Sequence, residues 1–330
     1  MCGIAHIDGP STPAYSSAMQ VYNQDAVASS LPYGGLIAAL EEAFRQEAVV
    51  PHRAHYQVAV PGAADATLLM MPAWQPGEFL GVKIATIHPG NTEKHLPSVN
   101  ATYLLLNANT GVPVAVLDGT ELTLRRTAAA SALASTYLSR EDAGILLMVG
   151  TGKLAPHLIC AHAAVRRFEE VMIWGRGTAA AARLAATLEP ASFELKVVDD
   201  LEWAVRRADV ISCATLATEP LIRGRWLRPG QHLDLVGAFR PDMSEADTDA
   251  IALAEVYVDT MDGATAEAGE IVQAMNIGRL DRSDIVGDLF ALTRGTCRRR
   301  ESAQTVTIFK SVGTALEDLA AAQLVLQARS

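Results

Sequence analysis

A short glycine-containing segment carries the sharpest chemical signal in the sequence. It reads Gly150-Thr-Gly152-Lys-Leu-Ala155, a G-x-G-x-x-A pattern, and it directly follows the apolar run 145–149. The first glycine permits a tight turn, the second lets the backbone approach a pyrophosphate, and the alanine lets a helix pack closely on the strand. The segment therefore predicts a dinucleotide site at the start of a helix. A nucleoside-triphosphate loop is not predicted, because Leu154 stands where such a loop needs a hydroxyl.

The end of the next expected strand indicates which dinucleotide is bound. After residue 173 the chain continues Trp174-Gly-Arg176-Gly, so no acidic residue is present where an Asp or Glu would bind the ribose 2′-hydroxyl of NAD. Gly175 leaves room there, and the guanidinium of Arg176 suits a 2′-phosphate. The alternative is a solvated turn arginine that binds no ligand. We expect NADPH as the cofactor, with NADH as the second choice.

The elements that must position these residues change in character near residue 127. Before it, the pattern predicts one helix and then mainly antiparallel strands. After it, short apolar strands alternate with amphipathic helices, which is typical of a parallel, doubly wound sheet. The expected helices are 36–48, 127–137, 155–166, 178–188, 201–207 and a long one within 305–328, where it follows a short strand or turn. The expected strands are 55–60, 67–71, 79–87, 101–107, 113–117, 145–149, 170–173, 194–198, 210–214, 232–236 and 256–259.

This change of pattern divides the chain into two expected domains, which also suits its length of 330 residues. The fold class is α/β, with a Rossmann-type doubly wound domain at 139–295. A second, α+β domain is expected at 1–138, completed by the tail 296–330. Residues 1–30 read as an irregular extension.

Composition and charge exclude several classes of protein. Half of the residues are hydrophobic and 19% are charged, which is enough for a packed core and excludes a disordered chain. With 27 basic against 37 acidic residues, the net charge of −10 disfavours nucleic acid and membrane surfaces as partners. Apolar runs are far shorter than the roughly 20 residues that span a bilayer, and the N-terminus has no signal-peptide pattern. We therefore expect a cytoplasmic protein.

Other reactive residues favour no second chemistry. The cysteines form no C-x-x-C pair, so neither a disulfide framework nor a zinc ribbon is expected. His157 and His162 are five residues apart and do not share a helix face, and no metal site is expected. The start Met1-Cys2-Gly-Ile is similar to that of glutamine amidotransferases. The rest of the chain leaves no room for such a domain, so Cys2 is interpreted as an incidental residue.

Several strings, taken in order and spacing, point to a family. They are GVKIATIHPGN at 81–91, LRRTAAASA at 124–132, the loop at 150–152, VGAFRPDMSE at 236–245 and IFKSVGTALEDLA at 308–320. Together they resemble the ornithine cyclodeaminase/μ-crystallin family from about residue 31 to the C-terminus. The stretch 233–245 is similar to the bacterial Δ1-pyrroline-2-carboxylate reductases of that family. The resemblance implies a homodimer whose first domain supplies both the dimer contacts and the substrate pocket.

The resemblance also implies that three cations face the substrate. Arg53 and Arg126 are implied to bind its carboxylate, and Lys83 is implied to be the catalytic residue, which completes the anion site and helps to polarise or protonate an imine. Arg125 matches less well, because the pattern places the arginine directly before Thr-Ala-Ala. The residue types agree, since a guanidinium binds a carboxylate with two hydrogen bonds and a lysine provides a point charge and a proton. A surface ion pair is the ordinary interpretation of a single arginine.

The chain departs from the family at one position. In ornithine cyclodeaminases the Val-Gly-Gly segment is followed by an aspartate that engages the substrate's side-chain amine. Phe239 stands there in this chain. A phenyl ring neither accepts a hydrogen bond from an ammonium group nor acts as a base. We expect Phe239 to line the substrate site and to favour an apolar ring.

The expected function is the NAD(P)H-dependent reduction of cyclic ketimine 2-carboxylates. Such an enzyme converts Δ1-pyrroline-2-carboxylate into L-proline and Δ1-piperideine-2-carboxylate into L-pipecolate. The alternatives are an ornithine cyclodeaminase, an alanine or N-alkyl amino acid dehydrogenase, and a non-catalytic binding protein similar to μ-crystallin. The residues expected to bind the cofactor are Thr127, Gly150, Thr151, Gly152, Lys153, Leu154, Ala155, Trp174, Gly175, Arg176, Ala214, Thr215, Val236, Gly237 and Ser311.

Overall fold

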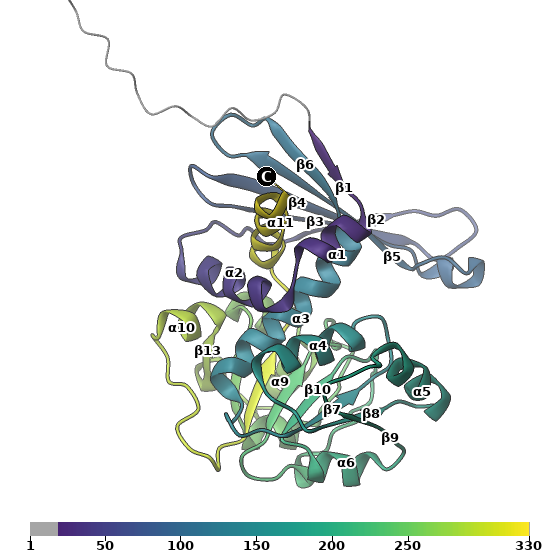
Figure 1. Cartoon of the computed structure of the whole chain (residues 1–330), viewed down its shortest axis with the longest axis vertical. Coiled ribbons are helices and arrows are strands. Elements are labelled where there is room, and N and C mark those ends of the chain that lie inside the picture. The colour runs from purple at the N-terminus through teal and green to yellow at the C-terminus, as the bar shows by residue number, and fades with distance from the viewer. Residues whose placement is uncertain (1–18, 330) are drawn as a thin grey trace, which may run out of the picture.

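Two sheets of different architecture make up the molecule, joined by one long helix (Figure 1). The computed structural model describes residues 19–329. Cys2 and the start that is similar to amidotransferases lie outside the described residues. Within them, the fold class expected from the sequence is confirmed.

The first sheet has six strands in the order β1-β6-β5-β4-β3-β2. Strands β2 to β6 pair antiparallel, and β1 pairs parallel with β6. In this register Lys83 lies between Met71 on β3 and Tyr103 on β5, and all three side chains are buried. The strands are β1 (Gln20–Tyr22), β2 (Ala54–Val58), β3 (Ala66–Trp74), β4 (Phe79–Ile87), β5 (Val99–Asn107) and β6 (Pro113–Asp118), with the 3-10 helix η1 (Pro89–Lys94) between β4 and β5.

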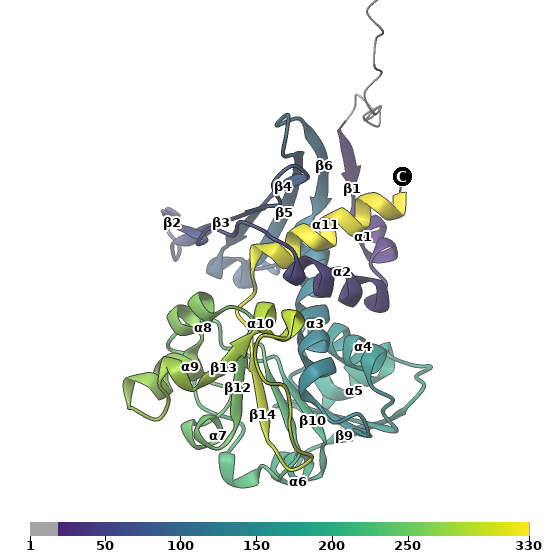
Figure 2. The same ribbon diagram turned by 90° about the vertical axis from the view of Figure 1, so that its left-hand side faces the viewer.

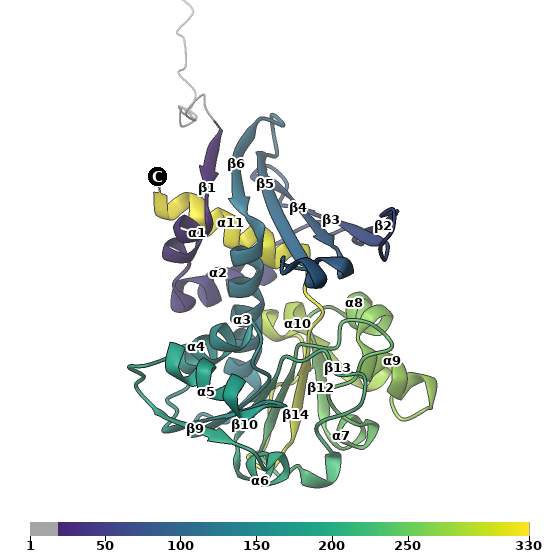
Figure 3. The same ribbon diagram turned by 90° about the vertical axis from the view of Figure 1, so that its right-hand side faces the viewer.

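Three helices cover one face of this sheet and a fourth, α2, packs on two of them, and Figures 2 and 3 show all four on the same side of its strands. They are α1 (Gln24–Ser30), α2 (Tyr33–Arg45), α3 (Gly119–Leu138) and α11 (Ala315–Arg329). In the described part of the chain the opposite face carries no helix. It presents apolar side chains that include Met70 and Ile84, which are 37% and 40% exposed. An antiparallel sheet with an apolar open face is suited to contact with another protein surface.

The second sheet has eight parallel strands in the order β13-β12-β14-β11-β10-β7-β8-β9. The chain leaves β7 toward β8 and β9 on one side and later continues on the other side with β10. This change of direction makes a switch point between β7 and β10, where ligands of such sheets bind beyond the carboxyl ends of the strands. The strands are β7 (Ile145–Val149), β8 (Glu170–Trp174), β9 (Glu194–Val198), β10 (Val210–Cys213), β11 (His232–Leu235), β12 (Glu255–Val258), β13 (Ile285–Asp288) and β14 (Thr307–Lys310).

Helices connect these parallel strands, as the alternating sequence pattern predicts. They are α4 (Ala155–Val165), α5 (Thr178–Thr187), α6 (Leu201–Arg207), α7 (Thr248–Leu253), α8 (Met261–Glu267), α9 (Gly269–Asn276) and α10 (Leu289–Arg294), with 3-10 helices η2 (Gly224–Trp226) and η3 (Arg282–Asp284). The sequence analysis assigned no element between residues 260 and 304, where α8, α9, β13 and α10 lie.

The tail differs from the expectation at β14. We expected residues 296–330 to complete the first domain, but β14 lies in the second sheet, between β11 and β12 (Figures 2 and 3). Only α11, after it, packs on the first sheet. All four side chains of β14 are buried, so the strand is stabilised by two parallel neighbours that are distant in the sequence.

Other elements also differ from the expectation, and α2 for example spans Tyr33–Arg45 and not 36–48. Helix α3 begins at Gly119, eight positions before the expected start at residue 127, because the Asp118 side chain accepts a hydrogen bond from the Glu121 amide and caps the helix. A side chain at Gly119 would contact the β5 backbone, since its Cβ would lie 2.7 Å from the Ala101 carbonyl carbon. Residues 20–30, expected to be irregular, instead form β1 and α1.

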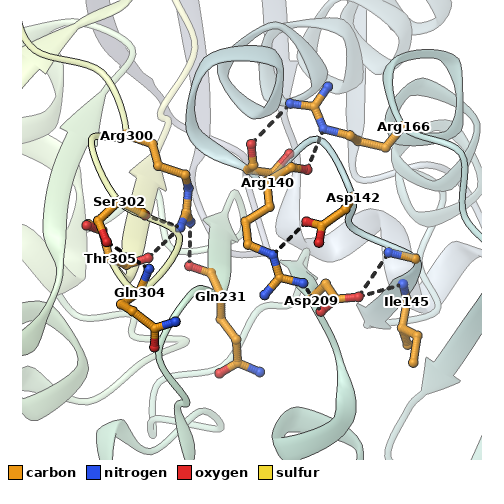
Figure 4. A network of polar contacts seen from close by, with 12 residues as sticks. Arg140, Asp142, Ile145, Arg166, Asp209, Gln231, Arg300, Ser302, Gln304 and Thr305 are labelled. Carbon is orange, nitrogen blue, oxygen red and sulfur yellow. Dashed lines mark hydrogen bonds and ion pairs between the residues drawn. The ribbon is translucent and has the colours of Figure 1, made fainter.

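Arginine side chains fix the carboxyl end of α3 to the second domain. Figure 4 shows the neighbouring part of this network, in which Arg166 donates to the carbonyl of Arg140 and Arg140 pairs with Asp209. Arg166 donates to the carbonyls of Ser135 and Ser139 at 3.0 and 3.1 Å, and Arg300 donates to the Leu138 carbonyl. The Leu138 and Ser139 carbonyls lie at the helix end, where amides of the helix cannot reach them, whereas the Ser135 carbonyl also accepts from the Ser139 amide at 3.0 Å. Because α3 also carries Arg126, its attachment to the second sheet holds that arginine beside the ends of the parallel strands.

Candidate functional site

The loops that follow β7 and β10 meet closely at the switch point. Gly150 has a φ of 121°, and a Cβ on it would lie 2.5 Å from the Ala214 carbonyl oxygen, so only glycine fits there. A Cβ on Gly152 would meet nothing within 4 Å, so this glycine faces open space. The approach of a pyrophosphate requires a tight turn at the first glycine and open space beside the second. The residues at this turn therefore fit a dinucleotide.

A cleft of about 330 Å³ extends from this turn toward α3 and the tail segment after β14. It is lined by Arg126, Thr127, Gly152, Lys153, Leu154, Ala214, Thr215, Leu216, Val236, Gly237, Phe239, Ser311, Val312 and Gly313. Most of the residues expected to bind the cofactor are thus brought together, and Arg126 and Phe239, which were expected to bind the substrate, line the same cleft. Phe239 is 39% exposed, and its ring lies 6.0 Å from the guanidinium carbon of Arg240.

The other expected cofactor residues do not line this cleft. Gly150, Thr151 and Ala155 form the turn and the start of α4 beside it. Trp174, Gly175 and Arg176 lie at and just after the end of β8, where a Cβ on Gly175 would lie 2.7 Å from the Thr151 methyl carbon. Arg176 is exposed and forms no ion pair with any residue from 19 to 329.

Lys83 and Arg126 share one buried carboxylate beside the cleft. The Lys83 ammonium nitrogen lies 2.8 Å from Oδ2 of Asp318, and Arg126 donates from Nε to Oδ1 of the same residue at 3.0 Å. Arg126 also donates from Nη1 to Glu317 at 2.5 Å. All four side chains are at most 6% exposed. Strand β4, helix α3 and helix α11 therefore each contribute charges to a single buried cluster.

Burial and neighbouring charges shift the pKa values in this cluster. Desolvation and the charge of Arg126 together lower the pKa of Lys83 to about 8, although Asp318 opposes the shift. Burial also raises the pKa of Glu317 to about 7, against the attraction of Arg126. Burial alone would lower the pKa of Arg126, but Asp318 and Glu317 outweigh it and raise that pKa. Lys83 can thus hold a proton at neutral pH and release it slightly above.

Arg53 lies near this cluster but lines a different cavity. It donates to the carbonyls of Val312 and Gly313 and lies 3.4 Å from Glu267. The cavity beside it, of about 340 Å³, shares Gly313 with the cleft described above. Arg53 also contributes to the lowered pKa of Lys83. The structure thus places Arg53 and Arg126 beside the loop after β14, with Arg126 on the cleft side. Lys83 instead contacts Asp318 on α11 and lines neither cavity.

Sequence reasoning assigned no role to the acidic residues that hold these cations. Glu317 and Asp318 were part of a quoted motif and are the acidic residues of α11, but no local pattern shows which cations they meet. Asp259 was also missed. Its Oδ2 accepts hydrogen bonds from the amides of Val312 and Gly313 at 2.8 and 2.6 Å, which fixes the loop between β14 and α11.

Among residues 19–329, no group of three or more His, Cys, Asp and Glu side chains could hold a metal ion. No helix in the same range is both long and apolar enough to cross a membrane.

Comparison with known proteins gives a family match over nearly the whole chain. Residues 18–329 match the model of the ornithine cyclodeaminase/mu-crystallin family. An uncharacterized protein of Schizosaccharomyces pombe is 45% identical over 320 residues, which cover 94% of this chain and 97% of that protein. A Δ1-pyrroline-2-carboxylate reductase of Colwellia psychrerythraea is 36% identical, covering 94% of this chain and 99% of the relative.

Solved structures agree with this match. The Δ1-pyrroline-2-carboxylate reductase of Thermococcus litoralis, in complex with NADH and L-proline, has a TM-score of 0.88 and 32% identity, covering 94% of this chain and 97% of that one. An archaeal alanine dehydrogenase dimer with bound NAD has a TM-score of 0.87 and 30% identity, covering 94% and 95%.

Proposed function

The chain belongs to the ornithine cyclodeaminase/mu-crystallin family, and from that premise we propose that it reduces the C=N bond of cyclic ketimine 2-carboxylates with a nicotinamide dinucleotide. Its substrates would be Δ1-pyrroline-2-carboxylate, giving L-proline, and Δ1-piperideine-2-carboxylate, giving L-pipecolate. The observation that carries the proposal is the pairing of Lys83 and Arg126 through Asp318, with Arg126 on the wall of the cleft. The relatives that act on Δ1-pyrroline-2-carboxylate support it.

The buried cations would bind and protonate the substrate. Arg126 offers a planar guanidinium for the ring carboxylate, and Arg53 would add a second contact from the other side of the loop after β14. The bound cofactor supplies a hydride to C2 of the ring. A proton must reach the ring nitrogen as the C=N bond is reduced, and Lys83 carries one at neutral pH because its pKa is about 8. Phe239 would lie against the apolar carbons of the ring.

The cofactor would be NADPH, with NADH accepted less well. The proposal rests on Arg176, which is exposed at the end of β8 with no acidic residue beside it in the sequence. The solved relatives hold NADH or NAD, so the preference for NADPH is a property proposed for this chain alone.

A homodimer is also proposed, which the archaeal alanine dehydrogenase dimer supports, together with a cytoplasmic location, which rests on the sequence pattern alone. The open face of the first sheet would form the dimer contact, since its strands present apolar side chains such as Met70 and Ile84 to solvent. The only other partner proposed is the small cyclic imino acid. The acidic net charge of −10 argues against nucleic acid.

A second candidate is alanine dehydrogenase, which the likeness to the archaeal enzyme favours. The two candidates differ in whether the C=N bond is supplied in a ring or forms from a keto acid and ammonia. Phe239 favours the ring, because an apolar wall suits ring carbons better than the small methyl group of alanine.

The test is the oxidation of NADPH, followed at 340 nm, with a panel of substrates. The panel contains pyrroline-2-carboxylate, piperideine-2-carboxylate, pyruvate with ammonia, pyruvate with methylamine, and no substrate. The proposal is supported if either cyclic imine is turned over rapidly and neither of the pyruvate mixtures is turned over. Turnover of pyruvate with ammonia alone would favour the alanine dehydrogenase, and turnover of nothing despite dinucleotide binding would favour a binding protein.

A further inference from the structure

The buried side chain of Glu245 forms hydrogen bonds with two of the loops that line the cleft. Its side chain is fully buried in the segment between β11 and α7. Oε1 accepts hydrogen bonds from the amide and the hydroxyl of Thr215 at 2.6 and 2.8 Å, and Oε2 accepts one from the amide of Gly237 at 2.6 Å. Thr215 follows β10 and Gly237 follows β11, and both residues line the cleft.

The two loops depend on this carboxylate because they lie beyond the paired strands. The ladder between β10 and β11 ends at Cys213 and Leu235. The loops then approach so closely that a Cβ on Gly237 would lie 2.0 Å from the Thr215 carbonyl oxygen. A carboxylate has two oxygens, so each can accept a hydrogen bond from the amide of a different loop. No single backbone carbonyl does this here.

Glu245 is itself held firmly. Its amide donates to Oε1 of Glu270 on α9 at 2.7 Å, and its carbonyl accepts from the amides of Leu221 and Ile222, each at 2.9 Å. The other oxygen of Glu270 lies 3.2 Å from the ammonium nitrogen of Lys310 on β14, and neither side chain is exposed. A buried line of charges thus extends from β14 through α9 to the wall of the cleft.

We propose that Glu245 is a positioning residue for the dinucleotide, because it holds the loops after β10 and β11 at the spacing that the cofactor needs. The inference rests on the proposed function, in that it takes the cleft to be the dinucleotide site. Glu245 itself touches no ligand in this account, and it acts through Thr215 and Gly237.

If the charge on Glu245 positions the loops, dinucleotide affinity should depend on pH. A purely structural role of this side chain would not produce that dependence. All three contacts donate to the carboxylate, and the two amides among them can only donate, so they favour the ionised form. Burial raises the pKa of Glu245 to about 7, Lys310 lowers it and Glu270 raises it. The Cys213 thiol on β10 also faces it and stays neutral, since burial raises its pKa. Dinucleotide affinity should therefore fall as the pH drops through about 7.

The test compares the full-length protein with Glu245→Gln, which keeps the shape and removes the charge. Asp234→Asn is the matched control, because Asp234 is equally buried in the second sheet but contacts Ser212 and His162, away from the cleft. NADH is titrated by fluorescence from pH 6 to 9, since it lacks the 2′-phosphate that would itself titrate. Thermal unfolding of each variant is measured in parallel.

We expect Glu245→Gln to bind NADH about tenfold more weakly at pH 8, the size of one lost hydrogen bond to a charged group, and to lose the pH dependence near 7. Asp234→Asn should keep the affinity and the pH profile of the wild type even if its melting temperature falls. Thr215→Val, which removes one of the three donors, should move the midpoint of the profile to higher pH.

Equal affinity and an unchanged profile in Glu245→Gln would overturn this inference alone. If Glu245→Gln does not fold, the Thr215→Val midpoint decides, and an unmoved midpoint counts against the inference. A wild-type protein that binds neither NADH nor NADPH would overturn the proposed function and this inference together.

Discussion

The carboxylate of Asp318 lies 2.8 Å from the ammonium nitrogen of Lys83, and both side chains are almost completely buried. Its other oxygen accepts a hydrogen bond from Arg126. Two cations that would otherwise repel each other in a dry interior are thus held side by side by one acid. Removing one partner of a buried ion pair is costly, because the remaining charge has no solvent to compensate it.

Replacing this acid should therefore change both stability and pH dependence. Asp318→Asn should lower the free energy of unfolding by ~3–5 kcal/mol, measured by denaturant titration. Wild-type kcat/KM for the cyclic imine should fall as the pH rises through about 8, where Lys83 loses its proton. Because Asp318 raises the pKa of Lys83, its loss should move this alkaline limb to lower pH.

Asp242→Asn is the control for this prediction. Asp242 pairs with Arg240 on the surface, where the two side chains are 63% and 57% exposed, so its loss should leave the stability and the pH profile almost unchanged. A wild-type rate that stays constant up to pH 10 would show that Lys83 is not the titrating proton donor.

Arg126→Lys should damage activity although the charge is kept. Arg126 uses Nε for Asp318 and Nη1 for Glu317, and an ammonium group cannot make both contacts and also bind a carboxylate with two parallel hydrogen bonds. A lost charged hydrogen bond in this sheltered site is worth about 1.5–3 kcal/mol, which is roughly ten- to over a hundredfold in kcat/KM.

The neighbouring arginine gives a matched control. Arg125→Lys changes a residue that contacts Glu121 and the Leu31 carbonyl outside the cleft, so kcat/KM should stay within about twofold of the wild type. An Arg126→Lys enzyme with full activity would remove Arg126 from the substrate site.

The sequence was informative where the signal is local. The turn at Gly150 and the helix that begins at Ala155 follow from a pattern of adjacent residues, and the structure has both at those positions. Lys83 and Arg126 could be named because they stand in family motifs. Their common partner Asp318 could not, since it is 235 residues from Lys83 and 192 from Arg126 along the chain. Nothing local fixes which of many acids a buried cation meets.

The position of β14 shows the same limit for the fold. The four residues of β14 are all buried, and a short buried strand could pair in either sheet. Its hydrophobic pattern does not indicate which sheet it joins. The strand is placed by neighbours at β11 and β12, which are far away in the sequence. Glu245 likewise stood in one of the quoted motifs. Its contacts with Thr215 and Gly237 could not be predicted, because they form only when the loops are folded.

Arg176→Ala should separate the two cofactors. Without the guanidinium, the 2′-phosphate of NADPH loses a charged partner, so KM for NADPH should rise about tenfold while KM for NADH stays almost the same. Arg183→Ala, on the exposed side of α5, is the control and should change neither value. Equal effects of Arg176→Ala on both cofactors, or a wild type that prefers NADH, would contradict the assignment of Arg176 to the phosphate.

Ile84→Glu should disrupt the proposed homodimer. Ile84 is 40% exposed on the open face of the first sheet, and a charge there would be buried without a partner in a dimer contact. Light scattering after size-exclusion chromatography should show a dimer for the wild type and mainly monomer for the variant. Leu253→Glu, at an exposed apolar residue on α7, should remain dimeric. A dimeric Ile84→Glu would exclude this face as the contact.

The protein should not convert ornithine into proline with release of ammonia, even when NAD is supplied. Cyclodeamination needs the side-chain amine to be held and deprotonated so that it can attack the imine carbon formed by oxidation at C2. Phe239 stands in the cleft at the position where an acid would bind that ammonium. A cationic group placed against the ring would lose solvent without gaining a hydrogen-bond acceptor, a penalty on the order of kcal/mol. A five-membered imine has no free amine and can pack its carbons on the same ring.

The measurement incubates the enzyme with ornithine and NAD and assays ammonia and proline, beside the reduction of pyrroline-2-carboxylate. Phe239→Leu is the apolar control and should keep imine reduction within about tenfold, because its side chain still offers a hydrophobic wall. Phe239→Asp should weaken binding of the cyclic imine, since it places a carboxylate beside the ring and adds a negative charge near the anion site. Ornithine turnover by the wild type at a rate comparable with imine reduction would refute both the role given to Phe239 and the reductase assignment.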